Sequence, residues 1–165
     1  MAFDIPKIPD EKIIEIMQHV IDMFLIPKFI DLGMDATGRW KNSLEARANN
    51  GNGEIWGEDY TQYLSRGRGP NKDSTTKAKI NFAVWMAKGN PEFKAWLAVK
   101  GLTAYGVPIA YKIADKGNDY YPDGTDLLDV LNSPECKAYI IEQIGTFYTL
   151  EISKILKKQI HDNFA

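Results

Sequence analysis

Residues 37–72 read TGRWKNSLEARANNGNGEIWGEDYTQYLSRGRGPNK, and they combine the strongest turn signal of the chain with many aromatic and basic side chains. The turn signal is NNGNG at residues 49–53. Asparagine and glycine adopt a positive φ at little cost, which tight hairpin turns require. We therefore predict a β-hairpin in which residues 44–48 run antiparallel to residues 54–57.

The hairpin is flanked by two predicted short helices. Thr37 is the expected N-cap of the first, and Asp59 is the expected N-cap of the second, because both side chains accept hydrogen bonds from free backbone N–H groups. Residues 66–72, RGRGPNK, then have the glycine and proline content of a loop. This loop is either an ordinary mobile surface loop or one that orders when it contacts a partner.

The segment before residue 37 predicts an extended arm and a long helix. Residues 1–9 contain two prolines and form the arm. Apolar residues then recur every three or four positions over residues 13–24, which is typical of a helix with one buried face, and Asp10 is the expected N-cap. Pro27 should kink or end this helix, and Gly33 should close its last turn.

The segment after residue 72 predicts further helices. Ser74 is the expected N-cap of the first, and Asn90 followed by Pro91 begins the second. Thr103 is the expected N-cap of a third helix, which Gly117 ends.

The C-terminal part predicts an acidic connector and a long helix. Residues 118–126 form the connector, and Thr125 or Asp126 caps a short helix that ends at Leu131. The final helix covers residues 134–162. We therefore predict that residues 1–165 form one α+β domain, mostly helical, with a small antiparallel β-hairpin or sheet and long N-terminal and C-terminal helices.

The composition is that of a globular protein without disulfides or membrane spans. The chain has 165 residues, 44% of them hydrophobic, and a net charge of −2, which is not the charge of a general nucleic-acid binder. Its single cysteine excludes an intrachain disulfide and a cysteine-rich zinc site. No apolar segment approaches the roughly 20 residues of a membrane span, and the N-terminus does not resemble a secretory signal.

Residues that could support catalysis or metal binding are few. His19 and His161 lie near opposite ends of the chain, and the first is expected to be structural or at the surface. The start of the last helix could lower the pKa of Cys136, but no histidine is near it in sequence. Residues 119–130 lack the glutamate that an EF-hand needs at its twelfth position, so a solvated acidic loop is the better interpretation. We expect no enzymatic activity, catalytic residue, metal or cofactor.

Two charge clusters of opposite sign lie between residues 66 and 135. The basic cluster consists of Arg66, Arg68, Lys72, Lys77, Lys79 and Lys88. The acidic cluster consists of Asp115, Asp119, Asp123, Asp126, Asp129 and Glu135. Both can be solvated faces, or the basic face can meet the acidic face of a neighbouring copy and close a ring. A third interpretation is a nucleic-acid-binding module that uses the basic cluster with Trp85.

The order of several short motifs resembles the tail-completion proteins, also called neck or head–tail joining proteins, of long-tailed bacteriophages. After the N-terminal helix come TGRWKNSL at residues 37–44 and IWGEDYTQYL followed by GRGP at residues 55–70. WLAVKG at residues 96–101 and IAYKIADKG at residues 109–117 come later. The resemblance covers roughly residues 10–120. The chain departs from the family at its C-terminus, where a long helix replaces the usual final strand.

The resemblance implies a non-enzymatic virion protein that is assembled in the host cytoplasm. Members of this family form rings between the portal or connector and the tail tube, around the DNA channel. The implied partners are copies of the chain, the portal or connector and tail-tube proteins, and the DNA in the channel, with no membrane. Aromatic side chains are common anchors in such interfaces, although they are as often part of the core. The candidate interface consists of Trp40, Trp56, Tyr60, Tyr63, Arg66, Arg68, Lys72, Asp119, Asp123 and Asp126.

Overall fold

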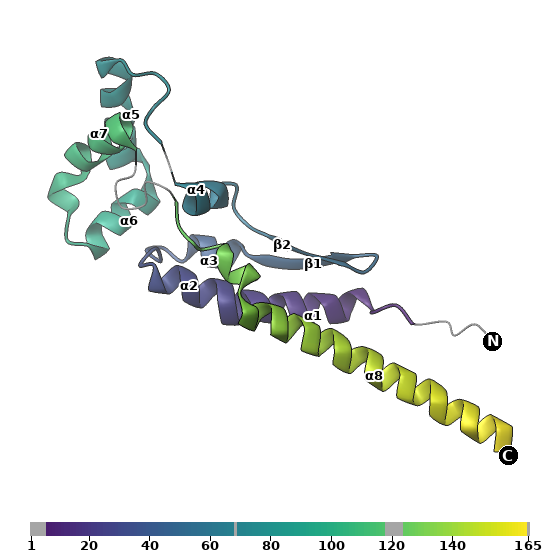
Figure 1. The fold of residues 1–165 in the computed structure, drawn as a ribbon. Coiled ribbons are helices and arrows are strands. Elements are labelled where there is room, and N and C mark those ends of the chain that lie inside the picture. Colours follow the sequence, from purple (N-terminus) through teal and green to yellow (C-terminus); the bar gives the residue numbers. More distant parts are fainter. Residues whose placement is uncertain (1–5, 68, 118–123, 165) are drawn as a thin grey trace.

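The computed structural model describes residues 6–67, 69–117 and 124–164 and has an α+β fold that is mostly helical (Figure 1). Within those residues the only sheet is a two-stranded antiparallel hairpin. The predicted fold class is therefore confirmed, including the long helices at both ends. The hairpin packs on the N-terminal helix. Three helices form a separate group: α5 (Thr76–Gly89), α6 (Pro91–Val99) and α7 (Gly106–Lys116).

The N-terminal helix continues past Pro27 by changing its hydrogen-bond pattern. It consists of α1 (Asp10–Val20), a π-helical segment η1 (Ile21–Leu25) and α2 (Ile26–Asp31). A proline in an α-helix lacks an N–H and its ring clashes with the carbonyl four residues earlier, which is Met23 here. The π-helical segment includes Met23, so the chain does not need the α-helical hydrogen bond between Pro27 and Met23 there. The helix therefore continues into α2. Gly33, with a φ of 65°, closes the last turn as predicted.

The predicted hairpin is confirmed. Strands β1 (Glu45–Asn49) and β2 (Asn52–Trp56) pair antiparallel, with Glu45 opposite Trp56. The two turn residues, Asn50 and Gly51, have φ values of 52° and 86°. Two consecutive positive φ values define the type I′ turn, whose twist matches that of the strands.

Asp10 holds the hairpin turn against the start of α1. We predicted that Asp10 caps this helix, but the N-cap residue is Pro9, and Asp10 is the first helical residue. Its carboxylate instead accepts hydrogen bonds from the backbone N–H of Asn50 (3.2 Å) and Gly51 (2.9 Å). Two residues 40 positions apart are thereby joined at the tip of the hairpin.

Replacing Asp10 with alanine is expected to loosen the hairpin tip. The loss of two hydrogen bonds to a carboxylate at an exposed site should lower the free energy of unfolding by about 1 kcal/mol. Hydrogen exchange should show faster exchange at the amides of Asn50 and Gly51. Glu11→Ala, in the same helical turn, is the control. Equal exchange rates in both variants would contradict the role of Asp10.

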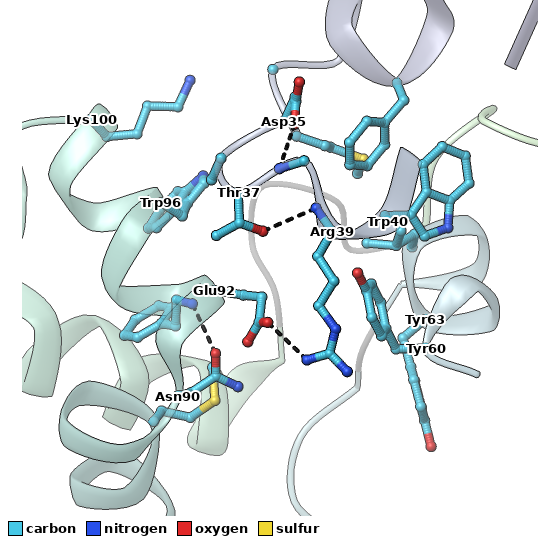
Figure 2. Close-up of a pocket in the computed structure, with 18 of the residues that line it drawn as sticks. Asp35, Thr37, Arg39, Trp40, Tyr60, Tyr63, Asn90, Glu92, Trp96 and Lys100 are labelled. Atoms are coloured by element: carbon cyan, nitrogen blue, oxygen red, sulfur yellow. Dashed lines mark hydrogen bonds and ion pairs between the residues drawn. The ribbon is translucent and has the colours of Figure 1, made fainter. Parts of the chain in front are cut away.

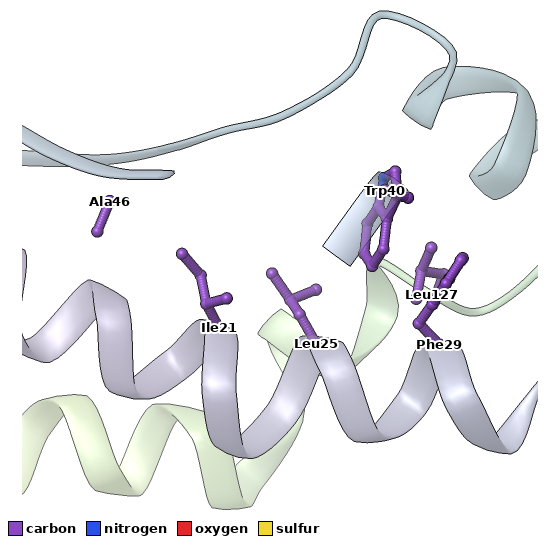
Figure 3. Packing of buried hydrophobic residues seen from close by; sticks show 6 residues of the cluster. All are labelled: Ile21, Leu25, Phe29, Trp40, Ala46 and Leu127. Atoms are coloured by element: carbon purple, nitrogen blue, oxygen red, sulfur yellow. The ribbon is translucent and has the colours of Figure 1, made fainter. Parts of the chain in front are cut away.

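The first core lies between the N-terminal helix, the hairpin and the returning chain (Figure 3). In Figure 3 the inner side chains of the helix point toward the hairpin and toward the indole of Trp40. The buried members of this core are Ile21, Leu25, Phe29, Trp40, Ala46 and Leu127. They come from both halves of the sequence, which makes the chain one domain in spite of the separate helical group.

Two short helices flank the hairpin, as predicted, but their caps differ from the expected ones. Helix α3 (Arg39–Ser43) has Gly38 as N-cap, although the Thr37 hydroxyl still accepts a hydrogen bond from the N–H of Arg39 (3.3 Å). Helix α4 (Thr61–Arg66) has Tyr60 as N-cap instead of Asp59. The predicted N-caps of α3 and α4 are therefore each one residue away from the observed N-caps.

The second core joins α5 (Thr76–Gly89), α6 (Pro91–Val99) and α7 (Gly106–Lys116). Its buried members are Ala83, Phe93, Leu97 and Ala110. Asn90 caps α6 as predicted, since its side-chain oxygen accepts the N–H of Phe93 at 2.8 Å. Thr75, not Ser74, caps α5, and Thr103 begins a 3-10 turn η2 (Thr103–Tyr105) before α7.

The chain then returns to the first core. The N–H of Thr125 donates to the carbonyl of Ser65, and its hydroxyl donates to the carbonyl of Leu64, both at 2.8 Å. These contacts satisfy carbonyls at the end of α4, where a helix lacks its own donors. Leu127 then enters the first core, and η3 (Asp129–Asn132) takes the place of the predicted short helix.

The last helix, α8 (Pro134–Phe164), begins on the body of the protein and then leaves it (Figure 1). The Ser133 hydroxyl caps it by accepting the N–H of Cys136 at 3.1 Å. Cys136 is fully buried, and the ring of Tyr139 stacks on His19 with 4.3 Å between ring centroids. The long C-terminal helix predicted from sequence is therefore confirmed.

Candidate functional site

Trp40 is a core residue, so little of its ring is available for the partner interface that the sequence predicted. Its side chain is 2% exposed, and its ring centroid lies 4.4 Å from that of Phe29. Its indole N–H donates to the hydroxyl of Thr61 at 2.9 Å, which satisfies the polar end of a buried ring.

The other three candidate aromatics are accessible. Trp56 at the end of β2 is 51% exposed, and the guanidinium of Arg47 lies 4.6 Å above its ring. Tyr63 on α4 is 57% exposed, whereas Tyr60 is half-buried and burial raises its pKa. These rings can take part in an interface without unfolding the core.

The predicted basic face is only partly free. Arg66 and Lys72 are exposed, but Lys79 binds Asp115 of the same chain at 2.5 Å. Hydrogen bonding to Lys79 lowers the pKa of the Asp115 carboxyl below its ordinary value. Arg68 lies outside the described residues.

The predicted acidic face also has an intrachain ion pair. Asp126 binds Lys28 at 2.5 Å, and this hydrogen bond lowers the pKa of Asp126. The Asp126 carboxylate therefore already has a partner in its own chain, whereas the sequence analysis predicted that it would contact a neighbouring copy. Asp119 and Asp123 lie outside the described residues, so their part in that contact stays a prediction.

A cleft of about 680 Å³ lies between the first core and the helical group (Figure 2). Its walls are largely apolar and aromatic: Met34, Trp40, Tyr60, Phe93 and Trp96 line it. One ion pair joins its two sides, because Arg39 on α3 binds Glu92 on α6 at 2.9 Å. Arg39 also binds Glu58 at 2.9 Å, and hydrogen bonds to Glu92 and Glu58 raise its pKa.

The Arg39–Glu92 pair gives the two sides of the cleft a pH-dependent connection. The hydrogen bond from Arg39 lowers the pKa of Glu92 from its ordinary value of 4.5. The pair therefore contributes its full stability above pH 4.5 and loses it as the pH falls through the folded-state pKa of Glu92.

We expect Glu92→Gln to lower the free energy of unfolding at neutral pH, and the difference from the wild type should shrink below pH 4.5. Chemical unfolding across a pH series, with Glu142→Gln on α8 as control, tests this; a pH-independent difference would contradict it.

The distal part of α8 carries the largest unpredicted feature. Beyond its first turns it has exposed apolar side chains, namely Ile141 (70%), Leu150 (56%), Ile152 (46%) and Leu156 (46%). A helix that is apolar on several sides is normally buried. The sequence predicts that these apolar residues belong to a helix. Only the structure shows that most of them lie in the part of α8 that extends away from the rest of the protein and are therefore exposed.

The residues that the sequence analysis weighed for metal binding and reactivity can be placed only where the structure describes their side chains. No group of three or more histidine, cysteine or acidic side chains that could hold a metal occurs among the described side chains, those of residues 6–67, 69–117 and 124–157. Burial raises the pKa of the Cys136 thiol, contrary to the lowering that its place at a helix start suggested. None of the described helices is long and apolar enough to cross a membrane.

Comparisons of the chain with protein-family models, with curated proteins and with solved structures found no match.

Proposed function

We propose that this chain is a structural subunit of a tailed bacteriophage, which assembles with copies of itself into a ring in the neck, between the portal or connector and the tail tube. The observation that carries the assembly part is the exposed apolar surface on the distal part of α8. Such surfaces mark interaction sites, because an isolated helix gains most of its stability from packing its apolar side.

The place in the phage neck rests on the sequence motifs and their order. The chain has an N-terminal helix, the segment TGRWKNSL, the hairpin, and the IWGEDYTQYL and GRGP segments in the order of tail-completion proteins. A ring there needs a subunit with accessible interface side chains. Exposed Trp56 and Tyr63 beside Arg66 suit such a contact.

The test is the assembly state of the purified full chain. Sedimentation velocity and negative-stain images should show closed rings, and the rings should bind the portal or tail-tube protein encoded by the same phage genome. A chain that stays monomeric at every concentration, both alone and with these proteins, would overturn the proposal.

A nucleic-acid-binding module is the second candidate. Trp85 on α5 is 56% exposed and lies between Lys77 and Lys88 in sequence, as basic and aromatic contacts to nucleic acid would need. Against it, Lys79 is already paired with Asp115. Binding of the monomer to DNA that weakens steeply with salt, without ring formation, would favour this second function.

Charge reversal in the basic loop should separate folding from assembly. We expect Arg66→Glu with Arg68→Glu to leave the circular dichroism spectrum and the unfolding midpoint unchanged but to prevent ring formation. Wild-type rings should also weaken as salt rises, because exposed charges are screened over about 8 Å at physiological ionic strength. The matched control is Lys94→Glu on α6, which is also exposed. Normal assembly of the double variant would exclude the loop from the contact.

A further inference from the structure

The charge of the chain is divided unevenly between its two parts. The helical group, residues 76–116, has seven lysines and two acidic residues, whereas the rest of the chain has 13 basic and 20 acidic residues. In Figure 1 this group lies apart from the hairpin and from α8. The small net charge of −2 therefore conceals a basic helical group attached to an acidic remainder. A localised positive charge of this kind is typical of a surface that binds a polyanion.

Both acidic residues of the helical group already have a partner within the chain. Asp115 on α7 binds Lys79 at 2.5 Å, and Glu92 on α6 binds Arg39 on α3 at 2.9 Å. These carboxylates are therefore engaged and leave the other lysines of the group uncompensated. The helical group thus presents most of its positive charge to the solvent.

Four exposed side chains with N–H donors lie in a row on α5. The row consists of Lys77, Asn81, Trp85 and Lys88, and Trp85 is 56% exposed. Their spacing of four, four and three residues places them within roughly 80° of the helix circumference. Ala83, which is buried in the second core, lies on the opposite side of the helix. We call these four exposed residues the α5 face.

The donors of the α5 face are not used inside the chain. The ammonium groups, the side-chain amide and the indole N–H all donate hydrogen bonds, and among these groups only the amide oxygen can accept one. No hydrogen bond or ion pair joins these four side chains to any other residue that the structure describes, and α5 contains no acidic residue. The row therefore suits a ligand that offers acceptors along its whole length.

Duplex DNA has this chemistry. The α5 face extends over eleven residues of helix, which is roughly 16 Å at 1.5 Å per residue. A duplex carries one phosphate charge per about 1.7 Å of its axis, twice the density of a single strand. Phosphate oxygens accept hydrogen bonds from lysine and asparagine side chains in many complexes. An acidic protein surface offers carboxylates at irregular positions, whereas phosphates repeat along the entire row, so the α5 face fits a duplex better.

We propose that the α5 face contacts the phosphate backbone of duplex DNA, and that the subunits turn this face toward the channel of the ring. The inference rests on the proposed function for its location, because the ring is what surrounds the DNA. Lys77 and Lys88 neutralise phosphates, and Asn81 and Trp85 donate hydrogen bonds to phosphate oxygens between them. Such contacts hold DNA without reading its sequence and let it slide. The acidic remainder of the subunit then faces away from the DNA, which it would repel.

Binding of the full chain to a labelled duplex of mixed sequence, measured by fluorescence anisotropy across a salt series, tests the contact. The wild type should bind the duplex more tightly than the matching single strand. Lys77→Gln with Lys88→Gln should weaken duplex binding roughly tenfold or more at low salt. It should also flatten the slope of log K against log salt concentration by about 1.8, because each neutralised phosphate contributes about 0.9.

The matched control is Lys94→Gln with Lys116→Gln. It removes the same charge from exposed positions of the helical group outside the α5 face, so it should bind like the wild type. Circular dichroism confirms that both double variants are folded. Equal losses of affinity in the two double variants would assign the binding to the overall charge of the group and overturn the proposal.

Uncharged substitutions test the two donors between the lysines. Asn81→Ala and Trp85→Phe should each weaken duplex binding roughly threefold to tenfold with an unchanged salt slope, because each removes an N–H donor but no charge. Trp85→Phe that binds like the wild type, or tighter binding to the single strand, would show that the ring stacks on bases. Either result would overturn the contact to a phosphate backbone.

Sedimentation velocity of the same proteins separates this inference from the proposed function. Wild-type rings that do not bind the duplex would overturn the α5 contact and leave the ring proposal standing. A chain that binds the duplex through the α5 face but stays monomeric would overturn the ring and the place of the contact in its channel. Loss of rings in Lys77→Gln/Lys88→Gln would assign the α5 face to a protein contact and overturn the inference. Normal rings of this variant with weakened DNA binding would support both proposals.

Discussion

Replacing Trp40 with alanine will lower the free energy of unfolding by about 3–5 kcal/mol, which is the usual cost of removing a buried aromatic ring. The ring is 2% exposed, lies against Phe29 and donates a hydrogen bond to Thr61. The variant leaves a cavity between the N-terminal helix, α3 and α4, and it leaves the Thr61 hydroxyl without the indole donor. Equilibrium unfolding in urea, followed by circular dichroism, measures the loss.

Trp56→Ala is the matched control for Trp40→Ala. Trp56 is 51% exposed, and its contacts are the overlying Arg47 and a hydrogen bond to Glu54. Contacts at the surface contribute little, so we expect a loss of at most about 1 kcal/mol. If the two variants were destabilised equally, Trp40 would not be the centre of the first core.

Gly124→Ala will be the most damaging single-methyl addition, with an expected loss of more than about 4 kcal/mol. Gly124 has a φ of 87°, and an added Cβ would lie 2.0 Å from the carbonyl oxygen of Ser65 and 2.6 Å from the carbonyl carbon of Arg66. Both are backbone atoms that cannot turn away. The returning chain must therefore move off α4, which breaks the two hydrogen bonds of Thr125 and displaces Leu127.

Gly51→Ala separates steric conflict from backbone strain. Gly51 has nearly the same φ, 86°, but an added Cβ there has no atom within 4 Å. Its cost should be the left-handed backbone conformation alone, about 1–2 kcal/mol. Thermal or chemical unfolding of the two variants side by side measures the difference. Similar losses of free energy of unfolding in the two variants would mean that the close contact between Gly124 and the backbone of Ser65 and Arg66 contributes little to stability.

Local chemistry made much of the fold predictable from the sequence. The hairpin turn follows from two adjacent residues that accept a positive φ, and α6 begins where Asn90 and Pro91 place it. The same chemistry misplaced several caps by one residue: the neighbouring hydroxyl of Thr75 caps α5, and α1, α3 and α4 follow Pro9, Gly38 and Tyr60, which make no side-chain cap hydrogen bond. It predicted that Pro27 would kink or end the helix, but not that a π turn would let the helix continue past it.

The candidate site was harder to predict, since exposure and pairing are set by distant parts of the chain. Trp40 and Trp56 look alike in sequence, yet the fold buries only one of them. Lys28 and Asp126 are 98 residues apart, and Arg39 and Glu92 are 53 apart, so no local pattern shows that they pair. The exposed apolar positions of α8 follow from the direction in which the helix leaves the body.

The order of segments in the first core also has a consequence for synthesis on the ribosome. The core needs the N-terminal helix, the hairpin and Leu127, whereas the helical group of residues 76–116 lies between them in the chain. Trp40 and Ala46 precede the helical group, so most of the first core can form before that group is translated, whereas Leu127 can join it only afterwards. That group has its own core from residues 83–110 and can pack first. Closure of the first core waits until Leu127 has left the exit tunnel, so the part of the core that Leu127 covers stays open until then.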